Sequence, residues 1–390
     1  MAVTVRVVSD PSGLDALREA WEQLTAAGAG DPLFGSFSWN QIWWRHYHAL
    51  GELRLLVAEQ DGAVVGILPL FLAERNFTDV EVDMIGPLRM VLPGKFAKLR
   101  QLAFLGSGEI CSDHLQPLVR PGLEHEVVES LLAFLAGRHD WHLLDLCDMC
   151  ADSPSVQALR EQLPKFFSAR RERFRYQAPY APLAPTYEEY LDTLSKKSRY
   201  NARKKLKQLR IYHQVEHRYH SDPATLDRAM DTFIELHRLR WEAEGLPGVF
   251  VNERFIGFHR EMSAEGLRRG WLRLGTLLVD GAPLFVTYTY HAGRRAYLYQ
   301  QGGAPDWQNF NLGYVALGFD IEEAIACGCT IYDILRGEAE YKLHWAKERR
   351  ELIEVQAARP GLRGRLFMLH STVNTDAQWR SKLKKLMGKK

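Results

Sequence analysis

The stretch AYLYQQGGAPDWQNFNLGYVAL, residues 296–317, decides how the second half of this chain is interpreted. Its first six residues have the apolar and aromatic composition of a buried strand. Gly302-Gly303 and Pro305 interrupt that strand, and an apolar, small-residue pattern typical of a helix begins near Asn311. The loop is either a plain connection between a strand and a helix or a segment built to hold an anion.

The composition predicts a globular protein with more than one domain. The 390 residues suit two domains of roughly 150–200 residues each. The formal net charge is only +2, so any basic surface must be local. The N-terminus has no signal-peptide pattern, and the longest apolar run, Gly62 to Ala73, contains Pro69 and is too short to span a bilayer.

Cysteine usage indicates a reducing compartment. The chain has 5 cysteines, an odd number. Cys147-Asp-Met-Cys150 lies in a strand-like run, with no second pair and no histidine at metal spacing. We therefore expect no metal site and a cytoplasmic location.

Two segments of the chain resemble each other. Residues 53–74 (LRLLVAEQDGAVVGILPLFLAE) and residues 272–293 (LRLGTLLVDGAPLFVTYTYHAG) both read as strand, Asp-Gly turn, strand. A short buried strand carrying an aspartate follows in each half, with Asp145 in WHLLDLCDM and Asp333 in CTIYDILRG. The order helices, hairpin, strand, helix, strand therefore occurs twice, which predicts a duplication.

The duplication predicts an α/β (α+β) fold made of two lobes. We expect a first lobe over residues 1–178, a second over 179–358 and a basic tail over 359–390. The first half carries an insertion of about thirty residues between Asp79 and about Arg120, with turn signals at Gly86-Pro87 and Pro93-Gly94.

The two halves differ where the helix before the aspartate strand begins. A helix start attracts an anion, and acidic side chains there would repel one. The first half opens this helix with PGLEHEVVE, which places Glu124 and Glu126 at the start, whereas FNLGYVALGFDIEEA has no acid before Asp320. The second half is therefore predicted to have a vacant anion site; the alternative is a helix capped by Asn309 or Asn311.

These patterns resemble the GNAT acyltransferase fold, and more closely the tandem GNAT-like acetyltransferases of the CelD/BcsL type, linked to cellulose or exopolysaccharide biosynthesis. Those proteins are similar to the FemAB/FemX aminoacyl transferases. The residues that carry the likeness are SKKSRYNARKKLKQL (195–209), the Asp-Gly hairpin, NLGY (311–314) and YDILRGEAEYKLHW (332–345). The strict glycine-spaced coenzyme A loop of GNAT proteins is absent.

The resemblance implies a donor site for the pyrophosphate of acetyl-CoA or another acyl-CoA at the loop after the fourth strand. The residues expected there are Gln301, Gly302, Gly303, Asn311, Leu312, Gly313 and Tyr314. Acyl transfer also needs a base for the acceptor and a proton for the departing thiolate. The catalytic candidates are Lys342, Asp333, Tyr341 and Tyr314, with a simple Asp333–Arg336 ion pair as the structural alternative; no general base is assigned.

The acceptor is expected to contact residues from both halves. The candidates are Asp113, His114, Arg199, Arg203, Trp241 and Arg336. Asp113-His114 is otherwise a local turn, and Trp241 and Trp307 are otherwise packing residues. Residues 195–210 hold eight lysines and arginines and no acid, which predicts either a solvated helix face or phosphate binding.

The leading hypothesis is an acyl-CoA-dependent N-acyltransferase acting on an amine or hydroxyl of a sugar or glycan precursor. The alternatives are an aminoacyl-tRNA-dependent peptidoglycan transferase and a non-catalytic interaction protein with the same fold. We expect no binding of double-stranded nucleic acid, and tRNA as a partner only under the first alternative. The basic tail is expected to allow weak contact with anionic lipid.

Overall fold

The structure is a computed structural model that describes residues 2–76, 98–337, 340–361, 363–365 and 367–368. The strands of the first half are β1 (Thr4–Val8), β2 (Glu52–Gln60), β3 (Ala63–Asn76), β4 (Lys98–Phe104), β5 (Leu118–Val119) and β6 (Leu143–Cys150). Its helices are α1 (Pro11–Ala16), α2 (Arg18–Ala26), α3 (Phe37–Tyr47), the 3-10 helix η1 (His48–Leu50), α4 (Glu124–Ala136) and α5 (Pro154–Phe166). The expected turns at Gly86-Pro87 and Pro93-Gly94 lie outside the described residues.

The later strands are β7 (Ala169–Pro182), β8 (Val215–Tyr219), β9 (Leu272–Val279), β10 (Ala282–Ala292), β11 (Arg295–Gly303), β12 (Ile331–Asp333) and β13 (Glu348–Ala358). The later helices are α6 (Tyr187–Thr193), α7 (Lys196–Tyr212), α8 (Pro223–Ala243), α9 (Glu253–Arg268), the 3-10 helix η3 (Pro305–Phe310), α10 (Leu312–Ala326) and α11 (Glu340–Trp345).

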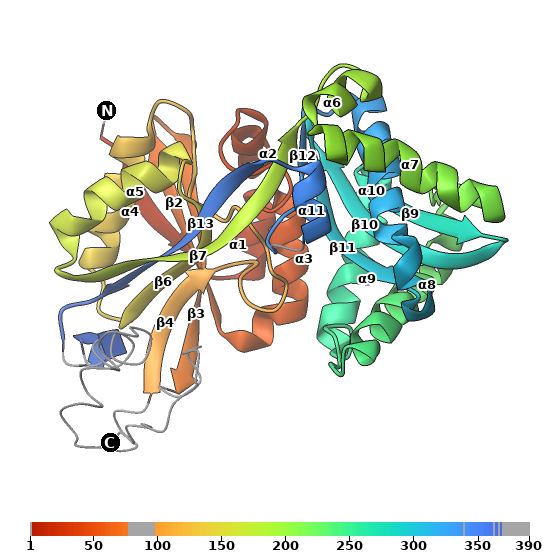
Figure 1. The fold of residues 1–390 in the computed structure, drawn as a ribbon. Helices are drawn as coiled ribbons and strands as arrows, with labels where there is room; N and C mark the ends of the chain where they lie inside the picture. Colours follow the sequence, from red (N-terminus) through yellow and green to blue (C-terminus); the bar gives the residue numbers. More distant parts are fainter. Residues whose placement is uncertain (1, 77–97, 338–339, 362, 366, 369–390) are drawn as a thin grey trace, which may run out of the picture.

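The described strands form one mixed sheet that runs through the whole molecule (Figure 1). The strand order is β1-β2-β3-β4-β6-β13-β7-β12-β11-β10-β9-β8, with β5 paired to β3. Helices cover both faces of each end of the sheet. In the second half α8 contacts β10 and β11 from one face, and α10 contacts β9, β10 and β11 from the other.

The strand order confirms the predicted duplication. In each half an edge strand (β1 or β8) is followed by an antiparallel hairpin (β2–β3 or β9–β10) and then by a parallel pair (β4 with β6, or β11 with β12). Ala103 is in register with Asp145 in the first parallel pair, and Tyr297 with Asp333 in the second. The two aspartates therefore occupy equivalent positions. The hairpin turns at Asp61-Gly62 and Asp280-Gly281 have positive φ at both residues, as such tight turns require.

The last strand of each half is exchanged between the halves. β7, which follows the first half in sequence, pairs with β12 of the second half through residues 180–182. β13, which ends the second half, pairs with β6 of the first half, and β7 and β13 pair with each other along their length. In Figure 1 they form the twisted ribbon that joins the two ends of the sheet. The expected lobe boundary at residue 178/179 falls inside β7, and the division into lobes stays a prediction.

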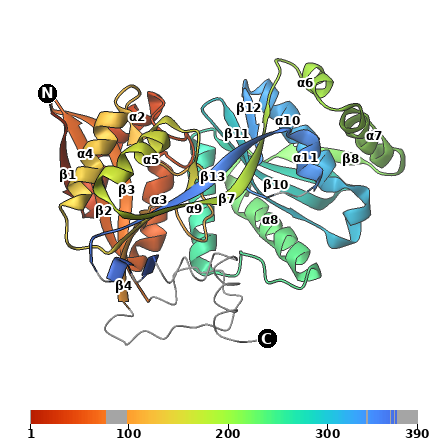
Figure 2. The same ribbon diagram turned by 60° about the vertical axis from the view of Figure 1, so that its left-hand side comes forward.

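Aromatic side chains of α3 join the halves on one side of this ribbon. Trp39 and Trp43 are fully buried, and the Trp39 ring lies 5.1 Å from the ring of Phe258 on α9 and 5.6 Å from that of Tyr299 on β11. Figure 2 shows α3 and α9 between the two ends of the sheet. The aromatic run on α3 is therefore part of a core that the two halves share.

Candidate functional site

Helix α10 begins without the side-chain cap that a helix start usually has. Asn311 occupies the N-cap position in a left-handed conformation (φ 55°, ψ 42°), and its side chain donates to the carbonyl of Asn309 at 3.0 Å instead of capping the helix. The amides of Tyr314 and Val315 donate to the carbonyl of Asn311. Among the described residues, the amides of Leu312 and Gly313 have no acceptor. Two N–H groups at the positive end of the helix dipole are therefore open to a ligand.

Helix α4, at the equivalent place in the first half, starts differently. Glu124 and Glu126 lie in its first turn, and the Glu124 carboxylate accepts the amide of Gly122 at 2.9 Å. An incoming anion would meet two carboxylates there. The asymmetry that the sequence predicts is present in the structure.

A cavity of about 280 Å³ opens at the start of α10. The lining comes from β10, the end of β11, η3, the first turn of α10 and the end of α8: Arg240, Glu244, Phe285, Gln301, Gly303, Ala304, Trp307, Asn311, Leu312, Gly313 and Tyr314. Six of the seven expected donor-binding residues thus line one cavity. We call it the donor pocket. Arg240 brings a positive charge, partly offset by Glu244 at 3.8 Å.

The glycines beside this pocket have packing roles that the sequence analysis did not anticipate. A Cβ on Gly302 would lie 2.5 Å from the backbone nitrogen of His237 on α8, so Gly302 allows that helix to pack closely on β11. Gly302 does not line the donor pocket. Gly303 and Gly313 both make room for the ring of Phe285, which would lie 2.5 Å from a Cβ on Gly303 and 2.9 Å from a Cβ on Gly313. Close packing, rather than approach to a ligand, explains these glycines.

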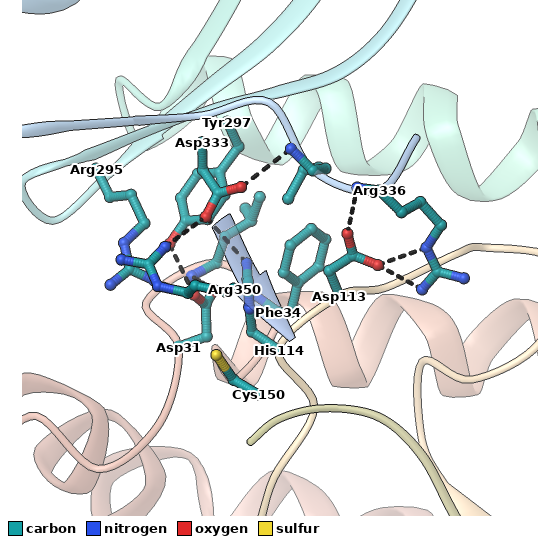
Figure 3. A network of polar contacts seen from close by, with 12 residues as sticks. Asp31, Phe34, Asp113, His114, Cys150, Arg295, Tyr297, Asp333, Arg336 and Arg350 are labelled. Atoms are coloured by element: carbon teal, nitrogen blue, oxygen red, sulfur yellow. Dashed lines mark hydrogen bonds and ion pairs between the residues drawn. The ribbon is translucent and has the colours of Figure 1, made fainter. Parts of the chain in front are cut away.

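Asp113 and Arg336 form an ion pair between the halves (Figure 3). Asp113, fully buried, accepts the Arg336 backbone amide at 2.8 Å and is paired with its guanidinium. The guanidinium also lies 3.0 Å from Asp148 and donates to the carbonyl of Ser112 at 3.2 Å. The alternative of a purely local turn at Asp113 is wrong, because its carboxylate bonds across the molecule.

Asp333 has a different set of partners. Its Oδ2 accepts from His114 Nε2 at 3.0 Å and from Arg350 Nη1 at 2.9 Å, and its Oδ1 accepts the amide of Leu335. The expected Asp333–Arg336 pair is therefore wrong. Burial acts to raise the pKa of Asp333, but His114 and Arg350 outweigh it and hold that pKa below its usual value. Asp333 is a charged hub without exposed surface, which favours a positioning role.

Lys342 contacts the backbone of the segment that carries this network. Its Nζ donates to the carbonyl oxygens of Ile334 and Arg336, at 3.2 and 3.3 Å. Burial, reinforced by the charge of Arg240 and opposed by Asp113 and Asp333, lowers the pKa of Lys342 to about 8. A neutral amine has two N–H donors, which the two carbonyls occupy, and its lone pair then remains to accept a proton.

A second, larger cavity of about 500 Å³ is bordered by Arg336 and Asp148. Its floor is one face of the four central strands, which present alternate side chains: Gln101 and Ala103 on β4, Asp145 and Cys147 on β6, Glu354 and Gln356 on β13, and Arg173 and Arg175 on β7. Tyr47, Glu109, Asn252 and Arg254 line its sides, and Tyr176 and Arg336 also border it. We call it the basin.

The floor of the basin holds closely spaced charges. Gln356 Nε2 donates to both Asp145 (3.1 Å) and Glu354 (2.6 Å), which places the two carboxyl groups side by side. Burial, with the adjacent charge of Glu354, raises the pKa of Asp145 well above its usual value. Asp148 is 4% exposed, and its Oδ1 has no hydrogen-bond partner among the described residues. A polar ligand would satisfy that oxygen.

The sequence analysis missed most of the basin. Asp145 was singled out only as a mark of the duplication, and Glu354, Arg173, Arg175 and Tyr176 were not considered. The run ARRERFRYQ, residues 169–177, carries arginines at alternate positions, which on a strand all point to one face. That alternation indicates a strand with one strongly basic face, and it could have pointed to the floor of the basin.

Several predicted site residues have side chains that are engaged elsewhere. Tyr314 lines the donor pocket, but its hydroxyl donates to the carbonyl of Ser198 at 3.0 Å. Trp241 donates from its indole to His237, and Arg199 and Arg203 pair with Asp192 and Glu188. The side chain of Tyr341 lies outside the described structure. The basic tail from residue 369 onward is also outside it.

Comparison with known families agrees with this geometry. Residues 196–343 match the family model described as an acetyltransferase (GNAT) domain. No curated protein sequence matches the chain. Residues 196–343 thus form a GNAT acetyltransferase domain, and the protein is an acyltransferase.

Solved structures extend the likeness to the whole chain. FemX is similar with a TM-score of 0.58 and 12% identity over 94% of this chain and 99% of FemX. A conserved protein of unknown function from Bacteroides thetaiotaomicron is similar with a TM-score of 0.55 and 14% identity, over 90% of this chain and 100% of that one. A tandem GNAT protein from the clavulanic acid biosynthesis pathway reaches a TM-score of 0.48 at 13% identity, over 92% and 100% of the two chains. At these identities the first two likenesses establish the fold.

Two further observations concern metals and membranes. Among the described residues, no group of three or more His, Cys, Asp or Glu side chains is arranged to hold a metal ion. None of the helices described here has both the length and the apolar character needed to cross a bilayer.

Proposed function

We propose that the protein transfers an acyl group from acyl-coenzyme A, bound in the donor pocket, to an amine or hydroxyl of an acceptor in the basin. The observation that carries the proposal is the uncapped, acid-free start of α10, whose open Leu312 and Gly313 amides face the donor pocket. Backbone amides at a helix start suit a pyrophosphate, and Arg240 adds charge. β11 and β12 pair only over residues 295–297 and 331–333, so the strands part before the pocket is reached.

The basin supports a sugar or glycan precursor as the acceptor. Its carboxylates, amides and arginines offer donors and acceptors to hydroxyl groups, and Tyr47 and Tyr176 provide rings for a sugar face. Assignment to the CelD/BcsL type, and to cellulose or exopolysaccharide biosynthesis, rests on the sequence resemblance. A cytoplasmic location is supported by the free thiol state of all five cysteines.

Lys342 is the residue we assign to take the acceptor's proton. Its amine donates to the backbone carbonyl of Arg336, whose side chain borders the basin. Its lowered pKa leaves a neutral fraction near neutral pH, and its carbonyl partners orient the lone pair. Asp333 and Asp113 hold the segment from residue 334 to 337 in place.

Heat-shift measurements test the donor assignment. Acetyl-coenzyme A should raise the unfolding temperature of the full chain, and free adenosine should not, because adenosine lacks the pyrophosphate. Equal shifts from both compounds, or none from the thioester, would contradict the proposal.

The acceptor assignment has a separate test. Release of free thiol from acetyl-coenzyme A, measured with a panel of amino sugars and neutral sugars, should be acceptor-dependent. Arg175→Ala should raise the acceptor KM and leave the acetyl-coenzyme A heat shift unchanged, since Arg175 lines only the basin.

An aminoacyl-tRNA donor is the second candidate, favoured by the likeness in fold to FemX. It predicts RNase-sensitive copurification of tRNA and no stabilisation by acetyl-coenzyme A. Both measurements can be made on one preparation of protein, and together they distinguish the two donors.

A further inference from the structure

Helix α7 presents a basic face with exposed apolar side chains. In Figure 1 and Figure 2 it lies at the outer side of the second half, away from the first half. Its inner side is formed by Ser198, Ala202, Leu206 and Leu209, which are buried or partly buried, and it packs against α10. At 100° per residue, Tyr200, Lys204, Lys207 and Ile211 project from the opposite side. We call these four residues the outer face of α7.

The apolar members of this region are unusually exposed. Tyr200 is 60% exposed, Ile211 63% and Tyr212 77%. At the same end of the helix the rings of His213, Trp307 and Phe310 contact one another, and Phe310 is 41% exposed. Single exposed apolar residues are common, but several of them on one basic helix are typical of an interaction surface.

The basic side chains of α7 are mostly free of acidic partners. Of the eight lysines and arginines, Arg199 pairs with Asp192 and Arg203 with Glu188. The other six have no acidic partner among the described residues: Lys196, Lys197, Lys204, Lys205, Lys207 and Arg210. The surface is thus strongly positive in a chain whose net charge is only +2.

We infer that the outer face of α7 binds an anionic lipid surface, with its lysines at the phosphate groups and Tyr200 and Ile211 in the interfacial region. A basic helix with aromatic and aliphatic side chains on its exposed side has the composition of interfacial helices. The positive charge is concentrated on this one helix, so one side of the protein can face the negative charge of an anionic lipid surface. Ile211 favours lipid over nucleic acid, because an aliphatic side chain can neither stack on a base nor hydrogen-bond to one. The inference does not depend on the proposed donor or acceptor.

Vesicle flotation with the full chain tests this inference. Vesicles of phosphatidylcholine with added phosphatidylglycerol should bind the protein, vesicles of phosphatidylcholine alone should not, and salt should weaken the binding. Each cation near the surface contributes about fivefold. The variant Lys204→Glu/Lys207→Glu should therefore weaken binding on the order of 100-fold, since reversal also adds repulsion. Ile211→Ser should weaken binding by about tenfold.

A matched control separates the helix face from total charge. Arg228→Glu/Arg294→Glu makes the same change in net charge at exposed positions away from α7, and it should bind vesicles like the parent protein. The acetyl-coenzyme A heat shift of the α7 variants should be unchanged, which keeps this test apart from that of the donor pocket.

Three outcomes would overturn the inference. The first is equal binding to anionic and neutral vesicles, and the second is unchanged vesicle binding by the α7 variant. The third is binding of tRNA, lost in the α7 variant, without binding to vesicles, which would make the face a nucleic-acid surface.

Discussion

The starts of α4 and α10 stand at equivalent points of a duplicated fold but suit opposite ligands. Glu124 and Glu126 occupy the first turn of α4, whereas α10 leaves the amides of Leu312 and Gly313 open. The strands around both helices follow the same order. The contrast shows that a duplicated scaffold can retain its architecture in both copies while a few side chains change the charge at the helix start, which under the proposed function decides which copy binds the donor.

The aspartates on β6 and β12 give a second contrast. Asp333 is surrounded by cations, and Asp145 lies beside another carboxyl group in the basin. Equivalent backbone positions thus carry a buried ion-pair hub in one half and an acid that lines the basin in the other.

Replacing each aspartate gives the largest expected difference between the halves. Asp333→Asn should lower the free energy of unfolding by about 3–5 kcal/mol, because His114 and Arg350 lose their buried counter-charge. Asp145→Asn should change it by less than about 1 kcal/mol, since Asp145 has a raised pKa and a neutral amide replaces it next to Glu354. Urea unfolding at neutral pH measures both.

The pH dependence provides a check on the first variant. The pKa of Asp333 is lowered by folding, so its contribution is present above the unfolded value and is lost as pH falls. The stability difference between parent and Asp333→Asn should shrink below about pH 4. A difference that stays constant on acidification would mean that the charge of Asp333 is not what stabilises the fold.

Lys342→Arg should lower the acyl-transfer rate by about 100-fold or more, because a guanidinium stays protonated and cannot act as a base. In the parent protein the rate should rise with pH through about 8, where the Lys342 amine becomes neutral. Lys347→Arg, the same change at an exposed lysine nearby, is the control and should retain the rate. A rate that is independent of pH between 6.5 and 9.5, roughly spanning this transition, would exclude Lys342 as the base.

Asn311→Asp places an acidic side chain at the start of α10, as α4 has at its own start. A carboxylate beside the open amides should weaken acetyl-coenzyme A binding by about threefold to thirtyfold through repulsion. The left-handed conformation at this position suits aspartate as well as asparagine, so the fold should be kept. Titration calorimetry compares the variant with Gln157→Glu, which adds the same charge on the distant helix α5. Equal affinities would show that the start of α10 is not where the donor's phosphates bind.

The opposite exchange should have the smallest effect. Glu124→Gln/Glu126→Gln removes the acids from α4 and should cost about 0.3–1 kcal/mol per residue in stability through the helix dipole. It should not create a second donor site, because neither the donor pocket nor the basin reaches the start of α4. Two bound donors per chain in calorimetry would contradict this.

The sequence was sufficient for features that local patterns encode. The Asp-Gly turns, the repeated element order and the absence of acids at the start of α10 are all short-range properties, and the structure has them. Six donor-pocket residues followed from the same stretch because strand end, loop and helix start are contiguous in sequence.

Features that depend on contacts between distant residues were not predictable. The short spacing in sequence suggests an ion pair between Arg336 and Asp333, three residues away. In the fold Arg336 instead forms ion pairs with Asp113 and Asp148 of the other half. Gly302 was assigned to a ligand because nothing in the sequence places His237 of α8 against it. The floor of the basin combines β4 and β6, which pair within the first half, with β13 and β7, which are placed beside them by the exchange of strands.

That exchange has a consequence for how the molecule holds together. Each end of the sheet is completed by a strand that the chain supplies from its other end, as in two partners of a swapped dimer joined by a linker. Pulling the ends apart would expose the edges of β6 and β12 at once, so the protein should melt as one cooperative unit. A cut between residues 347 and 348 would deprive the N-terminal end, not the C-terminal one, of a strand along the length of β6.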